Sequence, residues 1–351
     1  MKISIEVPEI SESEKMTPST FFQPSQTIVL KMNPKMPLQS IGKFEKFNNH
    51  WIVLDAVQNY IFRYDSSGIM VNRIGAIGNG PGEYLEITDF SAQNDEIVIY
   101  SNSSRKIIHY NLKGKVTKEL SVPFFANQIE ILDSFYILNT GTSNPDVPFD
   151  ILCLDRAGKV LDSFHNNSQI TLQLDFSSSG FLHKNMEDQI RFLPTFGNTV
   201  YNLNSETKFK PYLTIDLGPN EIDFTKFESM DKFLNSYFKY TWLSNRYFEN
   251  KAMLLFYYME DKRIKYAIHK KGEYKIYTRD QIKEVDQFKP ISVLKSGYID
   301  DQYFYSTYFI RPEDYQWIYT TIDWPQEVNS DTEKKSFIEK ADAIIFKYKI
   351  L

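Results

Sequence analysis

A hairpin unit recurs along the first half of this chain, and it constrains the fold more than any other feature. Each copy has a β-rich run, an Asp or Asn three residues before a glycine, and a second β-rich run, with glycines at Gly68, Gly114 and Gly158. The Asp or Asn side chain caps the turn, and glycine takes the positive φ that the turn requires. The glycines are 46 and 44 residues apart (68 to 114 to 158), a period typical of propellers or solenoids.

The later part of the chain repeats the unit less regularly. Strand-like runs are found at 189–193, 199–203, 212–215, 253–258, 265–268, 274–277, 291–294, 303–309 and 343–348. The fourth turn, 204–207, has lost its glycine, and the fifth contains Gly272. The apolar alternation has the wrong period for a helical repeat array. The chain is therefore predicted to be all-β, a six-bladed β-propeller with four-stranded antiparallel blades.

The two ends of the chain are predicted to close the ring together. The last unit lacks a fourth strand because the chain ends at Leu351, whereas Thr27–Lys31 is a strand without a blade. Open sheet edges invite aggregation, so we expect this N-terminal strand to be the outer strand of the last blade. Residues 1–20 are polar and are expected to form a flexible lead-in, followed by a single propeller domain over 21–351.

Two stretches depart from the repeat. Residues 220–250 carry apolar side chains at three-to-four spacing, which predicts a helical insertion between the fourth and fifth blades. Residues 311–340 interrupt the last blade and end in a polar run. Insertions of this length in a compact domain are either functional or mobile.

Composition excludes several classes of partner. The net charge is −5, the pI is about 5.7, and there is no long basic run, so nucleic acid is not expected as a partner. The sequence contains no run of about 18 apolar residues, so no membrane-spanning helix is predicted. The first residues contain neither an apolar signal-peptide segment nor a cysteine for lipidation, so no signal peptide is expected in the sequence as given. Cys153 lies in an apolar run and is expected to be buried and inert.

The glycine-rich stretch at 74–84 suggests a phosphate-binding loop but fails in detail. A P-loop ends in Gly-Lys-Ser/Thr, whereas Gly80 is followed by Pro81, Gly82 and Glu83. Pro81 also removes an amide donor, and Glu83 would repel an anion. The loop is therefore interpreted as structural, joining the first blade to the second. Its residues are Gly78, Gly80, Pro81, Gly82, Glu83 and Tyr84.

Residues 60–84, with their hairpin and the Gly-Pro-Gly-Glu-Tyr signature, resemble the six-bladed β-propeller family of Bacteroidetes. That family is similar to NHL-repeat propellers, and its members are commonly predicted to be exported lipoproteins. The C-terminal strand at 343–349 also resembles that family's closing strand, so the resemblance covers about residues 27–351. It implies an exported protein of the periplasm or outer-membrane surface. It brings no catalytic residues.

No catalytic motif or cofactor site stands out. The five histidines fall in different units and none has metal-ligand spacing. Carboxylates lie near strand ends, where six-bladed lactonases and lyases place metal ligands, although each is more commonly a solvated loop acid. These are Asp55, Asp89, Asp300 and Asp301. No Gly-x-Ser-x-Gly nucleophile motif is present.

Aromatic residues crowd the last two units, and those in the 311–340 insertion could form a binding platform. The candidates are Tyr315, Trp317 and Trp324. The sequence favours a monomeric, non-enzymatic binding or scaffold propeller at the cell envelope, with a glycan or protein ligand. The alternative is a metal-dependent hydrolase or lyase with its site on the propeller axis.

Overall fold

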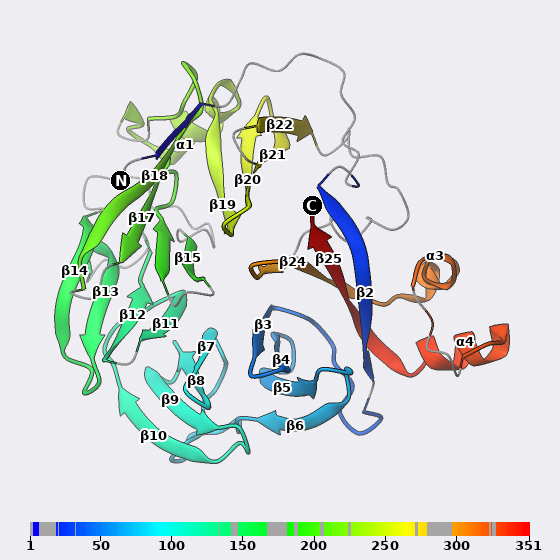
Figure 1. The fold of residues 1–351 in the computed structure, drawn as a ribbon. Helices are drawn as coiled ribbons and strands as arrows, with labels where there is room; N and C mark the ends of the chain where they lie inside the picture. Colours follow the sequence, from blue (N-terminus) through cyan, green and yellow to red (C-terminus); the bar gives the residue numbers. More distant parts are fainter. Residues whose placement is uncertain are drawn as a thin grey trace.

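The computed structural model describes residues 3–6, 19, 21–31, 33–132, 134–141, 147–166, 181–185, 189–203, 207–223, 226–270, 273–278, 297–322, 324 and 328–351. Six antiparallel sheets stand around a central axis, and each is a blade of four strands (Figure 1). The fold is a six-bladed β-propeller, as the repeat predicted.

Strands are named from the axis outward. The first blade consists of β3 (Lys43–Phe47), β4 (His50–Asp55), β5 (Tyr60–Asp65) and β6 (Met70–Ile74). The second consists of β7 (Asp89–Gln93), β8 (Glu96–Ser101), β9 (Lys106–Asn111) and β10 (Val116–Ser121). The third consists of β11 (Gln128–Leu132), β12 (Phe135–Asn139), β13 (Phe149–Asp155) and β14 (Val160–Asn166). The fourth consists of β15 (Phe181–Lys184), β16 (Ile190–Leu193), β17 (Thr199–Leu203) and β18 (Phe209–Asp216). The fifth consists of β19 (Trp242–Glu249), β20 (Met253–Glu260), β21 (Arg263–Lys270) and β22 (Glu273–Thr278).

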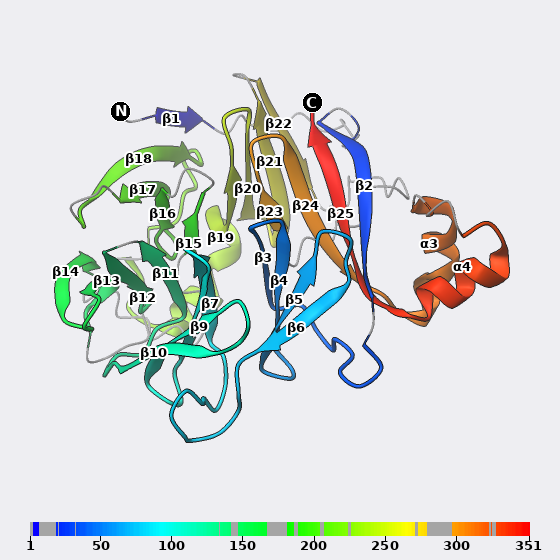
Figure 2. The ribbon, with the colours of Figure 1, turned by 60° about the horizontal axis from the view of Figure 1, so that its bottom comes forward.

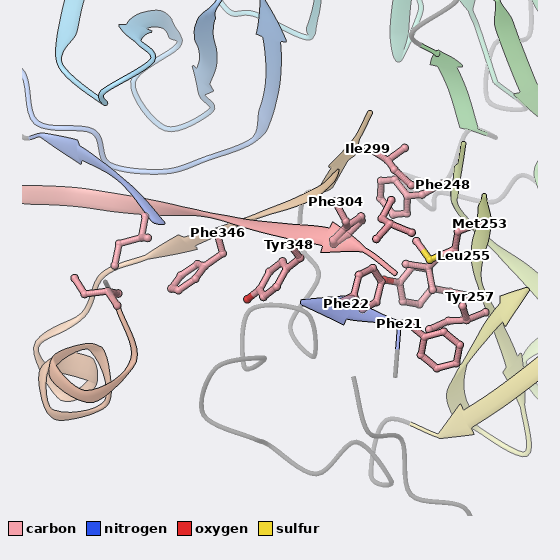
Figure 3. Packing of buried hydrophobic residues seen from close by; sticks show 14 of the residues in the cluster. Phe21, Phe22, Phe248, Met253, Leu255, Tyr257, Ile299, Phe304, Phe346 and Tyr348 are labelled. Carbon is pink, nitrogen blue, oxygen red and sulfur yellow. The ribbon is translucent and has the colours of Figure 1, made fainter. Parts of the chain in front are cut away.

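The sixth blade contains both ends of the propeller and confirms the predicted closure. It consists of β23 (Gly297–Ile299), β24 (Tyr303–Phe309), β25 (Ala341–Ile350) and, outermost, β2 (Phe22–Lys31). β2 runs antiparallel to β25 along its whole length (Figure 1). Phe22 lies beside Phe304, with ring centroids 5.6 Å apart (Figure 3). Burial of each such side chain contributes about 1.5–3 kcal/mol, so the N-terminal strand stabilises the closed ring.

Each pair of neighbouring blades encloses one apolar cluster. β4 shows how its sequence produces this packing. Ile52 and Leu54 belong to the cluster shared with the second blade, whereas Trp51 and Val53 belong to the cluster shared with the sixth. Because successive side chains of a strand point to opposite faces, a central strand with both faces covered must be apolar at every position.

The repeated turns have the predicted chemistry. The Asp65 carboxylate accepts hydrogen bonds from the backbone N–H groups of Ser67 and Ile69, and Gly68 has φ +83°. Equivalent bonds are made by Asn111 and Asp155 in the next two blades. The side chain and the glycine together fix each hairpin between the two outer strands.

Two expectations needed revision. The units recognised in sequence lacked the innermost strand of a blade, such as β3, because its residues alternate charged with apolar side chains where it borders the axis. In the described part of 220–250, the predicted helical insertion between the fourth and fifth blades contains α1 (Met230–Leu234) and a 3₁₀ turn, Tyr237–Lys239. Its end is β19, the inner strand of the fifth blade. The aromatic residues of this strand lie at a spacing that also fits a helix, so the sequence pattern does not separate the strand from the helical insertion.

Parts of the prediction fall on segments that the structure does not describe. The turn at Gly272, the strand at 291–294 and most of the fourth turn lie outside the described residues, as does most of the lead-in at 1–20. Within that lead-in, β1 (Ile3–Glu6) is described, and it pairs in parallel with β18 at the outer edge of the fourth blade.

The two faces of the ring differ. Successive strands of a blade run in opposite directions. After its fourth strand the chain is therefore on the face of the ring where the second strand connects to the third, and the connection to the next blade lies on that face too. We call this the insertion face. It carries residues 75–88 and 217–241, and also 310–340, which contain α3 (Tyr315–Thr321) and α4 (Asp331–Ile338). The opposite face carries Gly68, Gly114 and Gly158 and is called the turn face. Figure 2 shows α3 and α4 outside the ring, beside the start of β25.

Candidate functional site

The ring axis contains a cavity of about 870 Å³, within the range of about 300–1,000 Å³ typical of small-molecule sites. Side chains from all six blades line it. The cavity extends along β3 from Gly42 and Ala56 at the insertion face to Asn48 and Asp95 at the turn face. It is much larger than a second cavity of about 100 Å³ beside Arg191 and Tyr212, and we treat it as the candidate site.

Lys43, the first residue of β3, organises the charges in this cavity. Its Nζ lies 3.1 Å from Asp89 Oδ1 of the second blade, 3.1 Å from Glu45 Oε1, and 3.9 Å from Glu130 Oε1 of the third blade. The ammonium group also donates to the Phe90 carbonyl oxygen at 2.6 Å. One amine thus connects three blades across the wall of the cavity.

The pKa values follow from this arrangement. Burial by itself would lower the pKa of Lys43, but the carboxylates of Asp89, Glu45 and Glu130 outweigh it and hold that pKa above its ordinary value. Burial raises the pKa of Asp89 to about 6, although Lys43 and the Ile129 N–H, which donates at 2.9 Å, both oppose the rise. The cluster therefore holds its paired charges at neutral pH.

Polar contacts like these tie every pair of neighbouring blades around the axis. Besides Lys43 and Asp89, they join Ser91 to Glu130, Gln128 to Leu182, Arg191 to Glu249, Asn250 to Asp300, and Lys46 to Asp300 and Tyr305. Lys184 of the fourth blade also donates across the axis to the Ala92 carbonyl of the second, at 2.9 Å. Each pair of neighbouring blades is therefore joined by polar groups, and some of these groups, such as Lys43, Asp89 and Glu130, line the cavity.

His183 on β15 differs from the other lining residues. Its Nε2 is shielded from solvent and has no hydrogen-bond partner among the described residues. Its ring stacks on Phe181, with centroids 5.6 Å apart and planes at 15°. Burial, followed by the nearby charge of Lys43, lowers the pKa of His183 to about 4, so the imidazole is neutral at pH 7. A buried polar atom without a partner costs about 1–3 kcal/mol.

The glycine-rich loop at 74–84 is held by its own side chains. Gly80 N–H donates to Glu83 Oε2 at 2.8 Å, and Tyr84 is fully buried with its hydroxyl donating to the Asn59 carbonyl. A Cβ added at Gly78 would lie 2.1 Å from the Glu83 carboxylate. The Glu83 carboxylate therefore fills the space that a bound anion would need, which agrees with a structural role for the loop.

The three aromatic candidates lie on or after α3. Tyr315, Trp317 and Trp324 are all half-buried and pack against the cluster between the fifth and sixth blades. The Trp317 ring lies 4.9 Å from Tyr308 and 5.9 Å from Phe346, and Trp324 Nε1 donates to the Tyr319 carbonyl. These residues attach the insertion to the blade, and their outer edges remain at the surface.

The histidines and strand-end carboxylates have mostly local partners. His109 bonds to Glu96 and Tyr136, and Asp55 accepts hydrogen bonds from the 39–40 and 57–58 segments. Asp300 accepts N–H bonds from Gln302 and Tyr303 in its turn. In the described ranges no three His, Cys, Asp or Glu side chains gather in a metal-binding arrangement. Burial raises the pKa of the Cys153 thiol to about 12.

Comparison with known proteins identifies the family. A model described as a domain of unknown function, DUF4934, matches residues 2–343. The chain belongs to this family. A comparison with curated proteins gives no match for this DUF4934 chain.

Solved structures show the same fold. A Bacteroides fragilis protein classed provisionally as exported has a TM-score of 0.76 and 18% identity, and the match covers 100% of both chains. A member of the DUF4221 family from Bacteroides vulgatus has a TM-score of 0.54 and 10% identity, over 94% of this chain and 98% of that one. Identities this low establish the propeller fold alone. The resemblance to propellers of Bacteroides is confirmed at that level.

Among the described helices, none has the length and apolar character needed to cross a membrane.

Proposed function

We propose that this DUF4934 chain is a non-enzymatic binding or scaffold propeller of the bacterial cell envelope, and that its ligand, a glycan or a protein, contacts the insertion face. The supporting observation is that both insertions emerge from one face, which also holds one mouth of the axial cavity. The repeated strands supply a rigid ring, whereas inserted segments can vary in shape and chemistry without disturbing it.

Exposed apolar side chains are also present on the insertion face. Large apolar residues are exposed on or beside five of its connections. They are Val57 (63% exposed), Ile77 (45%), Leu85 (45%), Phe125 (46%), Leu234 (46%) and Phe309 (39%). Apolar side chains that a monomer leaves in water are a common component of binding surfaces. We also propose that Tyr315, Trp317 and Trp324 contribute their exposed edges to this face.

The proposed location depends on the family resemblance and on the Bacteroides fragilis relative classed provisionally as exported. We propose a monomer whose propeller domain spans 21–351 and which acts in the periplasm or at the outer-membrane surface. We also propose that the protein is anchored by a lipid and that its blades are related to NHL repeats.

A thermal-shift screen of glycans and envelope proteins tests the binding function, because a ligand that binds only the native state raises its stability. Hydrogen exchange with the best ligand then maps the contact. We expect protection at 55–59, 75–87 and 122–127 on the insertion face. The turns at 65–68, 111–114 and 155–158 serve as internal controls on the turn face. Protection confined to those turns, or the absence of any stabilising ligand, contradicts the proposal.

The alternative, a metal-dependent hydrolase or lyase, needs carboxylates that are available on the axis. Asp89 and Glu130 are the axial candidates, and both lie against the Lys43 ammonium group. No described contact favours this alternative over binding. Metal analysis of the purified protein distinguishes the two, since a stoichiometric divalent ion that is lost on replacing Asp89 would support the hydrolase.

A further inference from the structure

We propose that the axial cavity binds the end of an uncharged, hydroxyl-rich ligand, an oligosaccharide, which enters from the insertion face. This rests on the proposed function, because it names the class of ligand and the place where that ligand is held. The inference follows from three properties of the cavity wall: its charge balance, its amide side chains and its aromatic surfaces.

The Lys43 and Lys46 charges of the wall are paired with carboxylates of the protein, and Lys184 is hydrogen-bonded to neutral groups. The Lys43 ammonium group contacts three carboxylates, Lys46 lies 3.5 Å from Asp300 Oδ2, and Lys184 donates to a backbone carbonyl and to Ser91. A charged ligand that binds at Lys43 or Lys46 would have to displace a carboxylate partner and leave that carboxylate buried without its counter-charge, which is costly. An uncharged ligand can enter without breaking any of these pairs.

Amide side chains are the commonest polar groups in the lining. They are Asn48, Gln93, Asn94, Asn127, Gln128 and Asn185. An amide carries both N–H donors and acceptor lone pairs, and those of Gln128 and Asn185 are already bonded to Leu182 and Gln189. A sugar hydroxyl is likewise both a donor and an acceptor, so it can use both groups of an amide. An anion can use only donors and a cation only acceptors, so each uses only half of an amide. The lining therefore has the hydrogen-bonding character that a polyol requires.

Aromatic rings provide flat apolar surface beside these amides. Phe47, Phe181 and Phe248 line the cavity, and Phe181 forms a stacked pair with His183. The apolar C–H face of a hexose can lie on such a ring while its hydroxyls reach the amides. His183 Nε2 adds a buried polar atom with no described partner. Rotation of the imidazole about its Cβ–Cγ bond would present that atom to a ligand hydroxyl.

Two variants test the site without disturbing the protein's own contacts. Ala56 is exposed at the insertion-face mouth, so Ala56→Trp narrows the entrance and removes no buried group. His183→Phe keeps the stacked ring and removes only the polar atoms. Because the buried Nε2 atom makes no described hydrogen bond and its burial costs free energy, this variant should be at least as stable as the unmodified chain. Urea midpoints of both variants that are no lower than that of the unmodified chain establish that any loss of binding is local.

Titration calorimetry with maltotriose, cellotriose and chitotriose gives the readout, and trigalacturonate and tetraglycine serve as charged and peptide comparisons. We expect a neutral trisaccharide to bind more tightly than either comparison. Ala56→Trp should weaken that binding at least tenfold, and His183→Phe should weaken it by about three- to tenfold, the effect of one hydrogen bond.

Three results would overturn the inference: no binding of any neutral trisaccharide, tighter binding of trigalacturonate or tetraglycine, or wild-type affinity in both variants. A ligand that protects the insertion face but binds Ala56→Trp normally overturns the cavity site and leaves the proposed function standing. If no ligand protects the insertion face, the proposed function itself fails.

Discussion

Replacing Gly82 by alanine tests whether the loop at 74–84 has one fixed shape. Gly82 has φ +72°, a conformation that strains any residue with a Cβ. An added Cβ would also lie 2.4 Å from Val116 Cγ2 on the second blade. The backbone has little room to move, because the Gly82 N–H donates to Glu119 and its carbonyl accepts from the Tyr110 hydroxyl at 2.6 Å.

The expected cost has two parts. Alanine in the left-handed region costs about 1–2 kcal/mol, and forcing a methyl group into a packed site costs about 1–3 kcal/mol more. We therefore expect Gly82→Ala to reduce the free energy of unfolding by about 2–5 kcal/mol. Gly218 is a matched control. It has φ +84°, but nothing lies within 4 Å of the Cβ position, so Gly218→Ala should cost only about 1–2 kcal/mol.

Equilibrium unfolding in urea measures both costs. Adding Val116→Ala to Gly82→Ala removes the side chain that the new methyl group meets. The double variant should therefore recover most of the packing cost of about 1–3 kcal/mol. A double-mutant cycle isolates this coupling. Equal costs at Gly82 and Gly218, together with no coupling to Val116, would show that the loop adapts to the added group and would refute the reasoning.

Three further predictions concern closure, the insertion and pH. Deleting residues 1–18 removes β1 and should lower the melting temperature slightly. Deleting residues 1–32 also exposes the edge of β25 and should unfold the domain. Identical melting curves for the two truncated proteins and the full chain would contradict closure by β2. Trp317→Ala should lower the free energy of unfolding, measured in urea, by about 1–3 kcal/mol, because the Trp317 ring packs on Tyr308 and Phe346. Unchanged stability would mean that the ring is purely a surface group. Burial raises the pKa of Asp342 to about 6. The stability that this carboxyl contributes is therefore present below pH 3.8 and is lost as the pH rises through 6. Asp342→Asn should be more stable than the unmodified chain by about 1–3 kcal/mol at pH 7, with no gain near pH 3.5.

The repeated turns and the closure could be predicted from sequence because their signals are local. Asp65 and Gly68 determine their hairpin within four residues, and the same chemistry returns one period later. The N-terminal strand was assigned to the last blade by counting strands, which needs no knowledge of side-chain contacts. These features depend on the order of residues in the chain and on rules of backbone geometry.

The inner strands were harder to predict because the axis changes their composition. β3 reads Lys-Phe-Glu-Lys-Phe, so the charges that line the cavity interrupt the apolar pattern by which strands are usually recognised. β19 was missed for the opposite reason. Its aromatic residues continue a helix-like spacing that begins in α1, and only packing between the fourth and fifth blades determines that Leu243 and Tyr247 belong to a strand.

The Lys43 cluster is a case in which the repeat itself contained part of the answer. Lys43 and Asp89 are 46 residues apart, the same spacing as Gly68 and Gly114, and each begins the inner strand of its blade. Adding one period to a charged residue on an inner strand therefore locates its partner in the next blade. The rule fails at Glu130, because the link into the third blade is shorter and Gln128, not an acid, begins β11. Glu130 reaches Lys43 only because the ring brings the first and third blades together around the axis. A linear period can identify neighbours on adjacent blades, whereas contacts that span the cavity depend on the curvature and closure of the ring.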